Sequence, residues 1–427
     1  MTFKILSLDG GGIRGVVSVQ MLKEVERQIR ETYDLELHQY FDMITGTSTG
    51  SIIAAGLAKG LNTTRLLELY QNKAKQIFPQ PANFEKPWRF VRDLFSPKYS
   101  HDGLEKALED ESVLGKTKIG EITNTILLIL AYDMRYRNTT FFTNLHPDLG
   151  ARWYDELPLK DICISSSSAP TFFPPRELKA SNEEKFGNWS FPHIDGGVSA
   201  NNPSLAAISQ ALKVSRSYRG LSPEDQSKYN LKDLKLEDIS VLSIGTGRSA
   251  NPFEYGKIKK WNKLSWVERL VDVFMEPTGE INATICQNIL GGHKSGHYLR
   301  LDFDLNERYQ ISASEDENGN EKYKITRTLI EKKEERKNKY LVEAVKENLK
   351  EYKDYENNTR VNEDIDDPTD RNITTLIAAA QAFVDYGLIF ESRVYGSGPQ
   401  VKDAIQQFLK GNPVTHTTTN QPEALLV

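Results

Sequence analysis

The sequence has few cysteines, and this limits the covalent and metal chemistry that it can use. Only two occur among its 427 residues, Cys163 and Cys286, and neither belongs to a CxxC or Cys/His pattern. A disulfide framework and a zinc site are therefore both unsupported. His293 and His297 stand four residues apart, but the glycines around them disfavour a helix, and no HExxH glutamate is present. We predict no metal site, and we expect both cysteines to be buried as small apolar side chains.

A long hydrophobic run is also missing. The most apolar stretch, Ile126–Tyr132, is far shorter than the ~20 residues that a bilayer-spanning helix needs, and it is typical of a buried strand. Near the N-terminus, Asp9 stands where a secretory signal would need uninterrupted apolar residues. We expect a cytoplasmic protein.

The sequence lacks an excess of positive charge. Lysine and arginine together number 54 against 59 aspartates and glutamates, which gives a formal net charge of -5. Such a chain has no overall positive field with which to hold a phosphate backbone. We therefore predict that nucleic acid polymers are not partners.

Hydrophobic periodicity indicates an α/β fold. Phe3–Leu8 is a short apolar run that ends in glycines, and residues 15–32 carry apolar side chains at helical spacing. Tyr40–Thr45 begins a second unit of this kind, with a helix predicted at Ser51–Lys59. Further strand candidates are Thr125–Tyr132, Thr139–Thr143, Phe191–Ile194, Ile239–Ile244 and Tyr298–Phe303. Because helical stretches separate most of these, we predict a parallel or mixed sheet with helices on both faces.

The composition changes after about residue 312. A polar, turn-rich tip at Ser312–Glu321 precedes a Lys/Glu-rich segment, Thr326–Tyr352, which we predict to be a solvated helix. Ile373–Phe390 predicts an apolar helix, and the tail after Gly411 is typical of disorder. We predict an α/β unit over residues 1–310 and, over residues 311–427, a helical extension with flexible loops and a disordered tail.

One candidate catalytic residue is Ser48. It stands in Gly46-Thr47-Ser48-Thr49-Gly50, which matches G-x-S-x-G with a predicted strand before it and a predicted helix after it. Glycines on both sides allow a sharp turn that exposes a serine hydroxyl. The bare pattern is also typical of an ordinary turn, and the flanking elements favour the nucleophile.

A second motif, Gly10-Gly11-Gly12-Ile13-Arg14-Gly15, permits two interpretations. It fits the GxGxxG fingerprint of dinucleotide binding, and it fits an oxyanion hole built from free backbone N–H groups. The dinucleotide interpretation expects an acidic residue at the end of the next strand. That strand instead ends in Gly46-Thr47-Ser48. Acyl transfer therefore explains both motifs together.

The serine needs a base, and Asp195 is the best candidate. None of the seven histidines has the signature of a catalytic triad. Asp195 ends a short apolar strand and is followed by Gly196 and Gly197. Asp-Gly-Gly alone is typical of a turn, but a strand that ends here would carry the acid to the carboxyl edge of the sheet, where α/β folds place ligands.

Together these motifs resemble the patatin-like phospholipases. The family's motifs are D-G-G-G-x-[RK]-G, G-x-S-x-G and D-G-[GA], and they appear here in the same order as Asp9–Gly15, Gly46–Gly50 and Asp195–Gly197. Three further segments are similar to family patterns: Ser165–Pro175, Asn201–Pro203 and Ser243–Gly247. The resemblance covers residues 3–250, and nothing specific is recognised beyond residue 310.

The resemblance implies a three-layer α/β/α fold with a mostly parallel central sheet, followed by the helical C-terminal extension. It implies a serine acyl hydrolase with a Ser-Asp dyad, in which Ser48 is the nucleophile and Asp195 the base. Gly10, Gly11 and Gly12 would form the oxyanion loop, with Arg14 helping to position it. No cofactor is implied. The implied partners are a phospholipid or other acyl-lipid substrate and, transiently, a membrane surface at which the protein would be peripheral on the inner face.

Several alternatives remain open at this stage. The chain could be a nucleotide-binding protein that uses the glycine loop, or a patatin-like binding protein without catalysis. The extension could be a lid, a contact in a homo-oligomer, or a sensor for a small-molecule activator such as a cyclic nucleotide.

Overall fold

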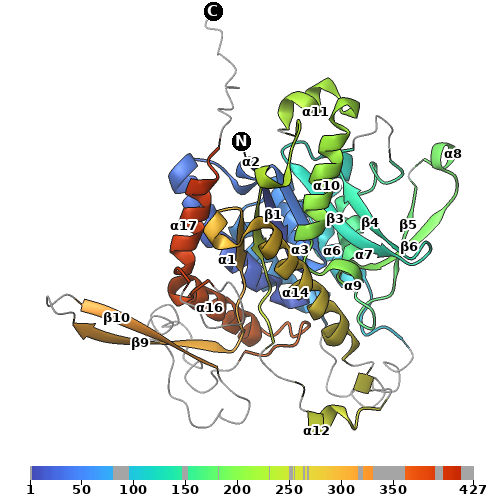
Figure 1. The fold of residues 1–427 in the computed structure, drawn as a ribbon. Helices are drawn as coiled ribbons and strands as arrows, with labels where there is room; N and C mark the ends of the chain where they lie inside the picture. The colour runs from blue at the N-terminus through green and yellow to red at the C-terminus, as the bar shows by residue number, and fades with distance from the viewer. Residues whose placement is uncertain are drawn as a thin grey trace, which may run out of the picture.

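The computed structural model describes most of the chain (Figure 1). The described residues are 2–79, 96–146, 152–180, 182–229, 231–249, 253, 255–262, 265–266, 269–315, 321–329, 361–389 and 398–414.

Eight of the strands in the described residues form one sheet, in the order β5-β6-β3-β2-β1-β7-β8, with β4 pairing to β3. Their bounds are Phe3–Leu8 (β1), Met43–Thr47 (β2), Ile126–Asp133 (β3), Asn138–Thr143 (β4), Arg176–Lys179 (β5), Ser190–Asp195 (β6), Ile239–Ile244 (β7) and Tyr298–Leu301 (β8). The run β3-β2-β1-β7-β8 is parallel, and β4, β5 and β6 pair antiparallel. The predicted mostly parallel sheet is confirmed.

Helices cover both faces of this sheet (Figure 1). The longer ones are Gly15–Tyr33 (α1), Thr49–Lys59 (α3), Thr63–Ile77 (α4), Asp102–Glu109 (α6), Leu159–Ser166 (α7), Ser204–Arg216 (α10), Leu270–Leu290 (α14), Asp370–Tyr386 (α16) and Val401–Gly411 (α17). Short helices are Leu37–Tyr40 (α2), Glu183–Phe186 (α8), Gly197–Ala200 (α9), Pro223–Lys228 (α11) and Tyr255–Ile258 (α12).

Alternate residues of each central strand divide the apolar core in two. On β1, Leu6 and Leu8 join the core that includes α1, α3, α16 and α17, whereas Phe3 and Ile5 join the core that includes α10 and α14. Two-sided burial explains why these strands are continuously apolar in sequence. The expected three-layer α/β/α architecture is therefore present.

The C-terminal residues share the first of these cores. The α16 side chain Phe383 stacks on Phe303 with ring centroids 4.7 Å apart. Tyr33 on α1 donates a hydrogen bond to the Leu409 carbonyl oxygen at 2.7 Å. The predicted apolar helix at Ile373–Phe390 corresponds to α16 and is confirmed as far as Tyr386. Its predicted end was wrong, because the helix stops before Gly387 and Leu388 forms a β-bridge with Gln400.

The prediction for the segment before α16 was partly wrong. Glu307–Glu315 (β9) and Glu321–Leu329 (β10) form an antiparallel two-stranded sheet, so the helix predicted to begin at Thr326 does not begin there. The segment 325–329 is rich in β-branched residues, which favour a strand. The Lys/Glu-rich run that follows it favoured a helix, and the helix was therefore predicted to begin too early. The tail predicted to be disordered after Gly411 begins later than predicted, because Asn412 is buried and its side-chain amide donates to the carbonyl oxygens of Gly296 and Phe408. The tail beyond residue 414 and the rest of the predicted helix lie outside the described residues.

Candidate active site

Ser48 lies in a sharp turn between β2 and α3. Its φ of 54° and ψ of -127° are values that residues other than glycine rarely adopt. The motif glycines allow this turn because backbones approach closely. A Cβ atom at Gly46 would lie 2.1 Å from the carbonyl oxygen of Gly50, and one at Gly50 would lie 2.3 Å from that of Leu8. Only glycine fits at either position, so the motif holds Ser48 at the carboxyl edge of β2.

The backbone of Ser48 is held on both sides by other serines. Its N–H donates to Ser166 Oγ at 2.9 Å, and Ser166 Oγ in turn donates to the Leu130 carbonyl oxygen at 2.6 Å. The Ser48 carbonyl oxygen accepts from Ser51 Oγ at 2.6 Å. Ser166 belongs to the Ser165–Pro175 segment that resembled the family, and these contacts give that segment a role in holding the elbow.

Asp195 and Ser48 lie at the same edge of the sheet. Thr47 pairs with Leu130 on β3, and Asp195 pairs with the next β3 residue, Ala131. The sequence therefore predicted the correct edge, but β6 runs antiparallel to β3, so Asp195 does not reach this edge as the end of a parallel strand. The turn at Gly196 depends on a close approach, because a Cβ atom there would lie 2.3 Å from the Leu130 carbonyl oxygen.

The carboxyl group of Asp195 is fully buried. Burial raises the pKa of Asp195 to about 7, and the neighbouring Ser48 hydroxyl and the Gly197 N–H oppose this shift. The Gly197 N–H donates to Oδ1 at 2.7 Å, whereas Oδ2 makes no well-formed hydrogen bond within the described residues. A buried carboxylate with one oxygen left unpaired beside a serine can accept a proton.

The glycine loop lies beside this pair. Gly10, Gly11 and Gly12 line the same pocket as Ser48 and Asp195. The Gly10 N–H is already bonded to the Asn201 carbonyl oxygen at 3.1 Å, and the Ile13 N–H to that of Ile365 at 2.8 Å. Within the described residues no backbone hydrogen bond uses the N–H of Gly11 or Gly12. These two N–H groups are therefore the donors that the loop can offer to an oxyanion.

Arg14 follows the loop and also lines the pocket. Its side chain is buried, and its Nη2 lies 3.9 Å from Glu276 Oε1 on α14. This long ion pair is consistent with a role for Arg14 in holding the loop against α14.

The pocket beyond these polar groups is largely apolar. It holds about 880 Å³ of empty space, part of which is open to solvent. Its apolar wall comes from the residue after the glycine loop, α3, α4, α6, the segment after α7, α14 and the C-terminal part, and consists of Ile13, Ile52, Tyr70, Ala74, Ile77, Phe78, Leu104, Ala169, Phe172, Phe173, Met275 and Ile365. Such a wall suits an acyl chain whose carbonyl end lies at Ser48.

The other candidate groups lie away from this pocket. None of the histidines in the described residues lines it, and both ring nitrogens of His193 are bonded, to the Phe191 carbonyl oxygen and to Thr140 Oγ1. His293 and His297 belong to no group of three or more potential metal ligands in the described part of the chain. Burial raises the pKa of both cysteines to about 12.

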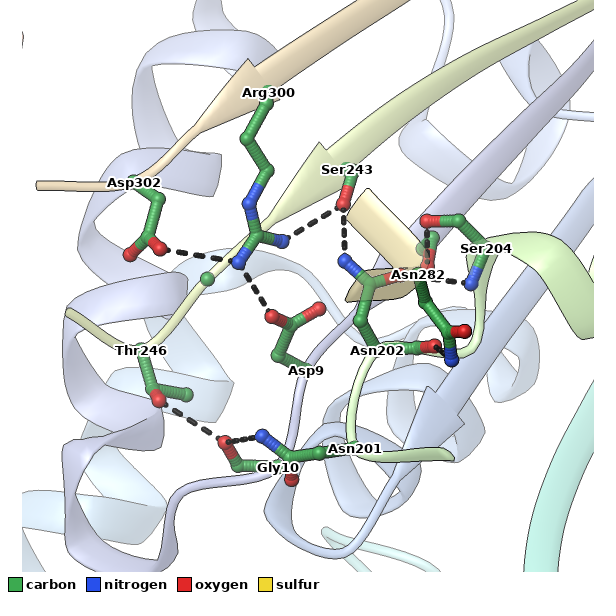
Figure 2. Close-up of polar contacts among 12 residues, drawn as sticks. Asp9, Gly10, Asn201, Asn202, Ser204, Ser243, Thr246, Asn282, Arg300 and Asp302 are labelled. Carbon is green, nitrogen blue, oxygen red and sulfur yellow. Dashed lines mark hydrogen bonds and ion pairs between the residues drawn. The ribbon is translucent and has the colours of Figure 1, made fainter. Parts of the chain in front are cut away.

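A cluster of polar side chains behind the glycine loop was missed by the sequence analysis (Figure 2). Arg300 on β8 contacts Asp9 Oδ2 at 2.6 Å and Asp302 Oδ2 at 3.1 Å, and it donates to Ser243 Oγ at 2.8 Å. Burial raises the pKa of Asp9 to about 6, and Arg300 opposes the shift. An arginine within the apolar run Tyr298–Leu301 was the signal that could have revealed a buried partner.

Comparison with known proteins assigns the family. The chain is 34% identical over 326 residues to Patatin-like protein 1 of Arabidopsis thaliana, and the match covers 70% of this chain and 74% of that relative. The chain belongs to the patatin-like phospholipase family. Residues 6–208 match the family model described as patatin-like phospholipase, a range that includes the glycine loop, Ser48 and Asp195.

The chain is also similar to two further members of the patatin-like family. The chain is 31% identical over 330 residues to Patatin-like protein 3 of Arabidopsis thaliana, covering 70% of this chain and 73% of the relative. It is 29% identical over 315 residues to Probable inactive patatin-3-Kuras 1 of Solanum tuberosum, covering 70% and 77%. Membership supports lipid ester hydrolysis at the level of the family, and catalysis by this chain needs its own test.

Proposed function

We propose that this protein hydrolyses fatty-acyl ester bonds of lipids, as a phospholipase A or lysophospholipase, through an acyl-enzyme on Ser48. The observation that carries the proposal is the arrangement at one edge of the sheet. A serine in a strained turn lies level with a buried aspartate, and both open with the glycine loop onto a largely apolar pocket. This is the set of groups that acyl transfer needs.

In the first half of the reaction Asp195 takes the proton from Ser48 Oγ, which attacks the ester carbonyl carbon. The N–H groups of Gly11 and Gly12 donate to the oxyanion that forms. When the carbon–oxygen bond to the alcohol breaks, Asp195 returns the proton to the leaving alcohol, and an ester of Ser48 remains. The raised pKa of Asp195 suits both transfers, because a general base works best when its pKa is near the working pH.

In the second half a water molecule replaces the alcohol. Asp195 takes a proton from this water, whose oxygen attacks the acyl carbon, and the same N–H groups stabilise the second oxyanion. The bond to Ser48 Oγ then breaks, Ser48 recovers its proton, and the fatty acid leaves. The proposed steps use only residues of this chain and water.

A lipid substrate also requires contact with a lipid surface. We expect a cytoplasmic protein that meets the inner membrane face transiently. No helix in the described residues is long and apolar enough to span a bilayer.

Labelling with a fluorophosphonate probe tests the proposal, because this probe reacts with activated serines. The native protein should be labelled and should release fatty acid from phospholipid or lysophospholipid, and Ser48→Ala should abolish both. Ser18→Ala is a matched control, since Ser18 is buried on α1 and does not line the pocket.

Labelling that survives Ser48→Ala would move the nucleophile elsewhere. A native protein that is folded but neither labelled nor active would favour a patatin-like binding protein without catalysis. Tight binding of a dinucleotide would instead favour the other interpretation of the glycine loop.

A further inference from the structure

Two segments that the proposed reaction does not use meet at the glycine loop. They are Asn201–Pro203, which follows α9, and Ser243–Gly247, at the end of β7. Each supplies one side chain to the same backbone atom, the carbonyl oxygen of Gly10 (Figure 2). Thr246 Oγ1 donates to it at 3.0 Å, and Asn201 Nδ2 at 3.4 Å.

These two contacts fix the direction of the next N–H group. Gly10 C=O and Gly11 N–H belong to one peptide unit, and no cis peptide bond occurs in the described residues. In a planar trans peptide the carbonyl and the N–H point in opposite directions. Holding the Gly10 carbonyl toward Thr246 and Asn201 therefore turns the Gly11 N–H away from those side chains. Gly11 lines the pocket, as does Asn201, whereas Thr246 does not.

We propose that Asn201 and Thr246 are positioning residues, which orient the Gly11 N–H as an oxyanion donor by binding the Gly10 carbonyl oxygen. The inference rests on the proposed function, because it assigns these residues to the oxyanion of that reaction. It gives the Asn-Asn-Pro and Ser-Ile-Gly-Thr-Gly segments a shared purpose.

Asn201 links the oxyanion loop to the base. Its carbonyl oxygen accepts from the Gly10 N–H at 3.1 Å, so Asn201 binds Gly10 through backbone and side chain together. One short helix, α9, separates it from Asp195. Its Oδ1 is buried without a partner in the described residues, which leaves the amide held by its Nδ2 contact. The segment that carries the base thus also holds the donor loop.

A network of charged and polar groups anchors both positioning residues. Arg300 binds Asp9, the residue before Gly10, and Ser243, three residues before Thr246. Ser243 Oγ also accepts from Asn202 Nδ2 at 3.0 Å, next to Asn201. Arg300 and Ser243 therefore link the end of β1, the segment after α9 and the end of β7, which meet at Gly10. Such preorganisation is what makes a donor effective in the transition state.

The test replaces the Thr246 hydroxyl without changing the side chain's shape. Losing an oxyanion donor outright costs about 10²–10³ in rate, so a donor that stays present but loses its orientation should cost about 10- to 100-fold. Thr246→Val should lower kcat on a short soluble ester by that factor and leave KM within about threefold. Thr246→Ser, which keeps the hydroxyl, should restore most of the rate.

A second measurement separates orientation from general damage. A trifluoromethyl ketone with a matched acyl chain forms a tetrahedral adduct with the serine, and its affinity should fall in parallel with kcat in Thr246→Val. The affinity for the fatty acid product should not change. Ser18→Ala is the control, since Ser18 Oγ donates to the Gly245 carbonyl oxygen at 2.7 Å, a buried contact one residue from Thr246 that does not involve Gly10.

The outcomes distinguish this inference from the proposed function. If the native protein turns over and Thr246→Val behaves like Ser18→Ala in rate and in ketone affinity, the positioning role is wrong and the hydrolase stands. An equal loss of ketone and fatty acid affinity would show a merely structural effect and would also overturn the role. A native protein without turnover would refute the proposed function itself.

Discussion

At the scale of single residues, the site combines two states that are unfavourable on their own. Ser48 has a positive φ, which costs about 1–3 kcal/mol in a residue other than glycine. Asp195 is a carboxyl group with no exposed surface and no cation among the causes of its pKa shift. Neither state helps folding, and both suit the serine attack and the proton transfer to aspartate that we propose. This is the balance expected of a functional site rather than of a structural turn.

The raised pKa of Asp195 predicts how activity depends on pH. The base must be ionised to accept a proton, so kcat/KM on a soluble ester should rise with pH and reach half its maximum near pH 7. Burial also raises the pKa of Asp9, to about 6, so the variant of Asp195 is what assigns the profile to the base. Asp195→Asn should fold and lose turnover at every pH. A flat profile between pH 5 and 8 in the native enzyme would contradict Asp195 as the base.

The raised pKa of Asp195 also predicts how stability depends on pH. Activity should rise with pH, whereas the contribution of Asp195 to the free energy of unfolding should fall. The pKa of Asp195 is raised from 3.8 on folding, so its protonated form favours the folded state and this contribution is lost as pH rises toward about 7. Each unit of raised pKa corresponds to about 1.4 kcal/mol. Asp195→Asn carries no such cost, so its Tm advantage over the native protein should grow from pH 4 to pH 7 and then level off. An advantage that shrinks with pH would contradict the buried, uncompensated carboxylate.

At the scale of secondary-structure elements, prediction from sequence succeeded for strands whose own residues show a clear apolar pattern. Phe3–Leu8 and Ile239–Ile244 were predicted with the bounds that the structure shows, because strands buried on both faces are continuously apolar. The strand Arg176–Lys179 was missed, since an edge strand of charged residues has no apolar pattern. The three motifs gave Ser48, Asp195 and the glycine loop. The contacts of Arg300, Thr246 and Asn201 could not be predicted, because they depend on which strands become neighbours.

The packing of α16 and α17 predicts how the C-terminal residues contribute to stability. Phe383 on α16 is 1% exposed, within the core that also contains α1 and α3. Phe383→Ala should cost about 3–5 kcal/mol and lower the urea midpoint of the whole protein in one transition. Gln407→Ala, an exposed change on α17, is the control and should have little effect. Two separate transitions, with only one shifted by Phe383→Ala, would show that the C-terminal part folds as an independent domain.

At the scale of the whole molecule, the net charge disfavours binding to an anionic membrane, whereas one part of the surface favours it. The formal net charge of -5 disfavours approach to an anionic membrane. One stretch of surface differs, because the exposed aromatics Phe253, Tyr255 and Trp266 flank the exposed lysines Lys257, Lys259 and Lys260 there. Tyr255 is 75% exposed. Aromatic and basic side chains side by side are typical of proteins that bind at a membrane interface.

This aromatic and basic stretch lies just before α14 in the chain, and α14 supplies Met275 and Glu276 to the pocket. A surface that binds lipid here would bring substrate close to the mouth of the site.

The membrane prediction therefore concerns this surface and not the total charge. Removing two exposed aromatics, in Tyr255→Ser with Trp266→Ser, should weaken co-sedimentation with vesicles that contain phosphatidylglycerol by at least about tenfold, because the two aromatics together contribute ~1.4 kcal/mol or more when they enter the interface. Turnover of a soluble ester should not change.

Trp189→Ser is the matched control, since Trp189 has the same 47% exposure as Trp266 but lies on the β5–β6 hairpin. Binding should also weaken with added salt, because the lysines contribute through screened attraction to the anionic lipid. Equal sedimentation of the double variant and Trp189→Ser would exclude this surface as the membrane-binding site. It would also contradict the expectation that lipid bound here brings substrate close to the mouth of the pocket.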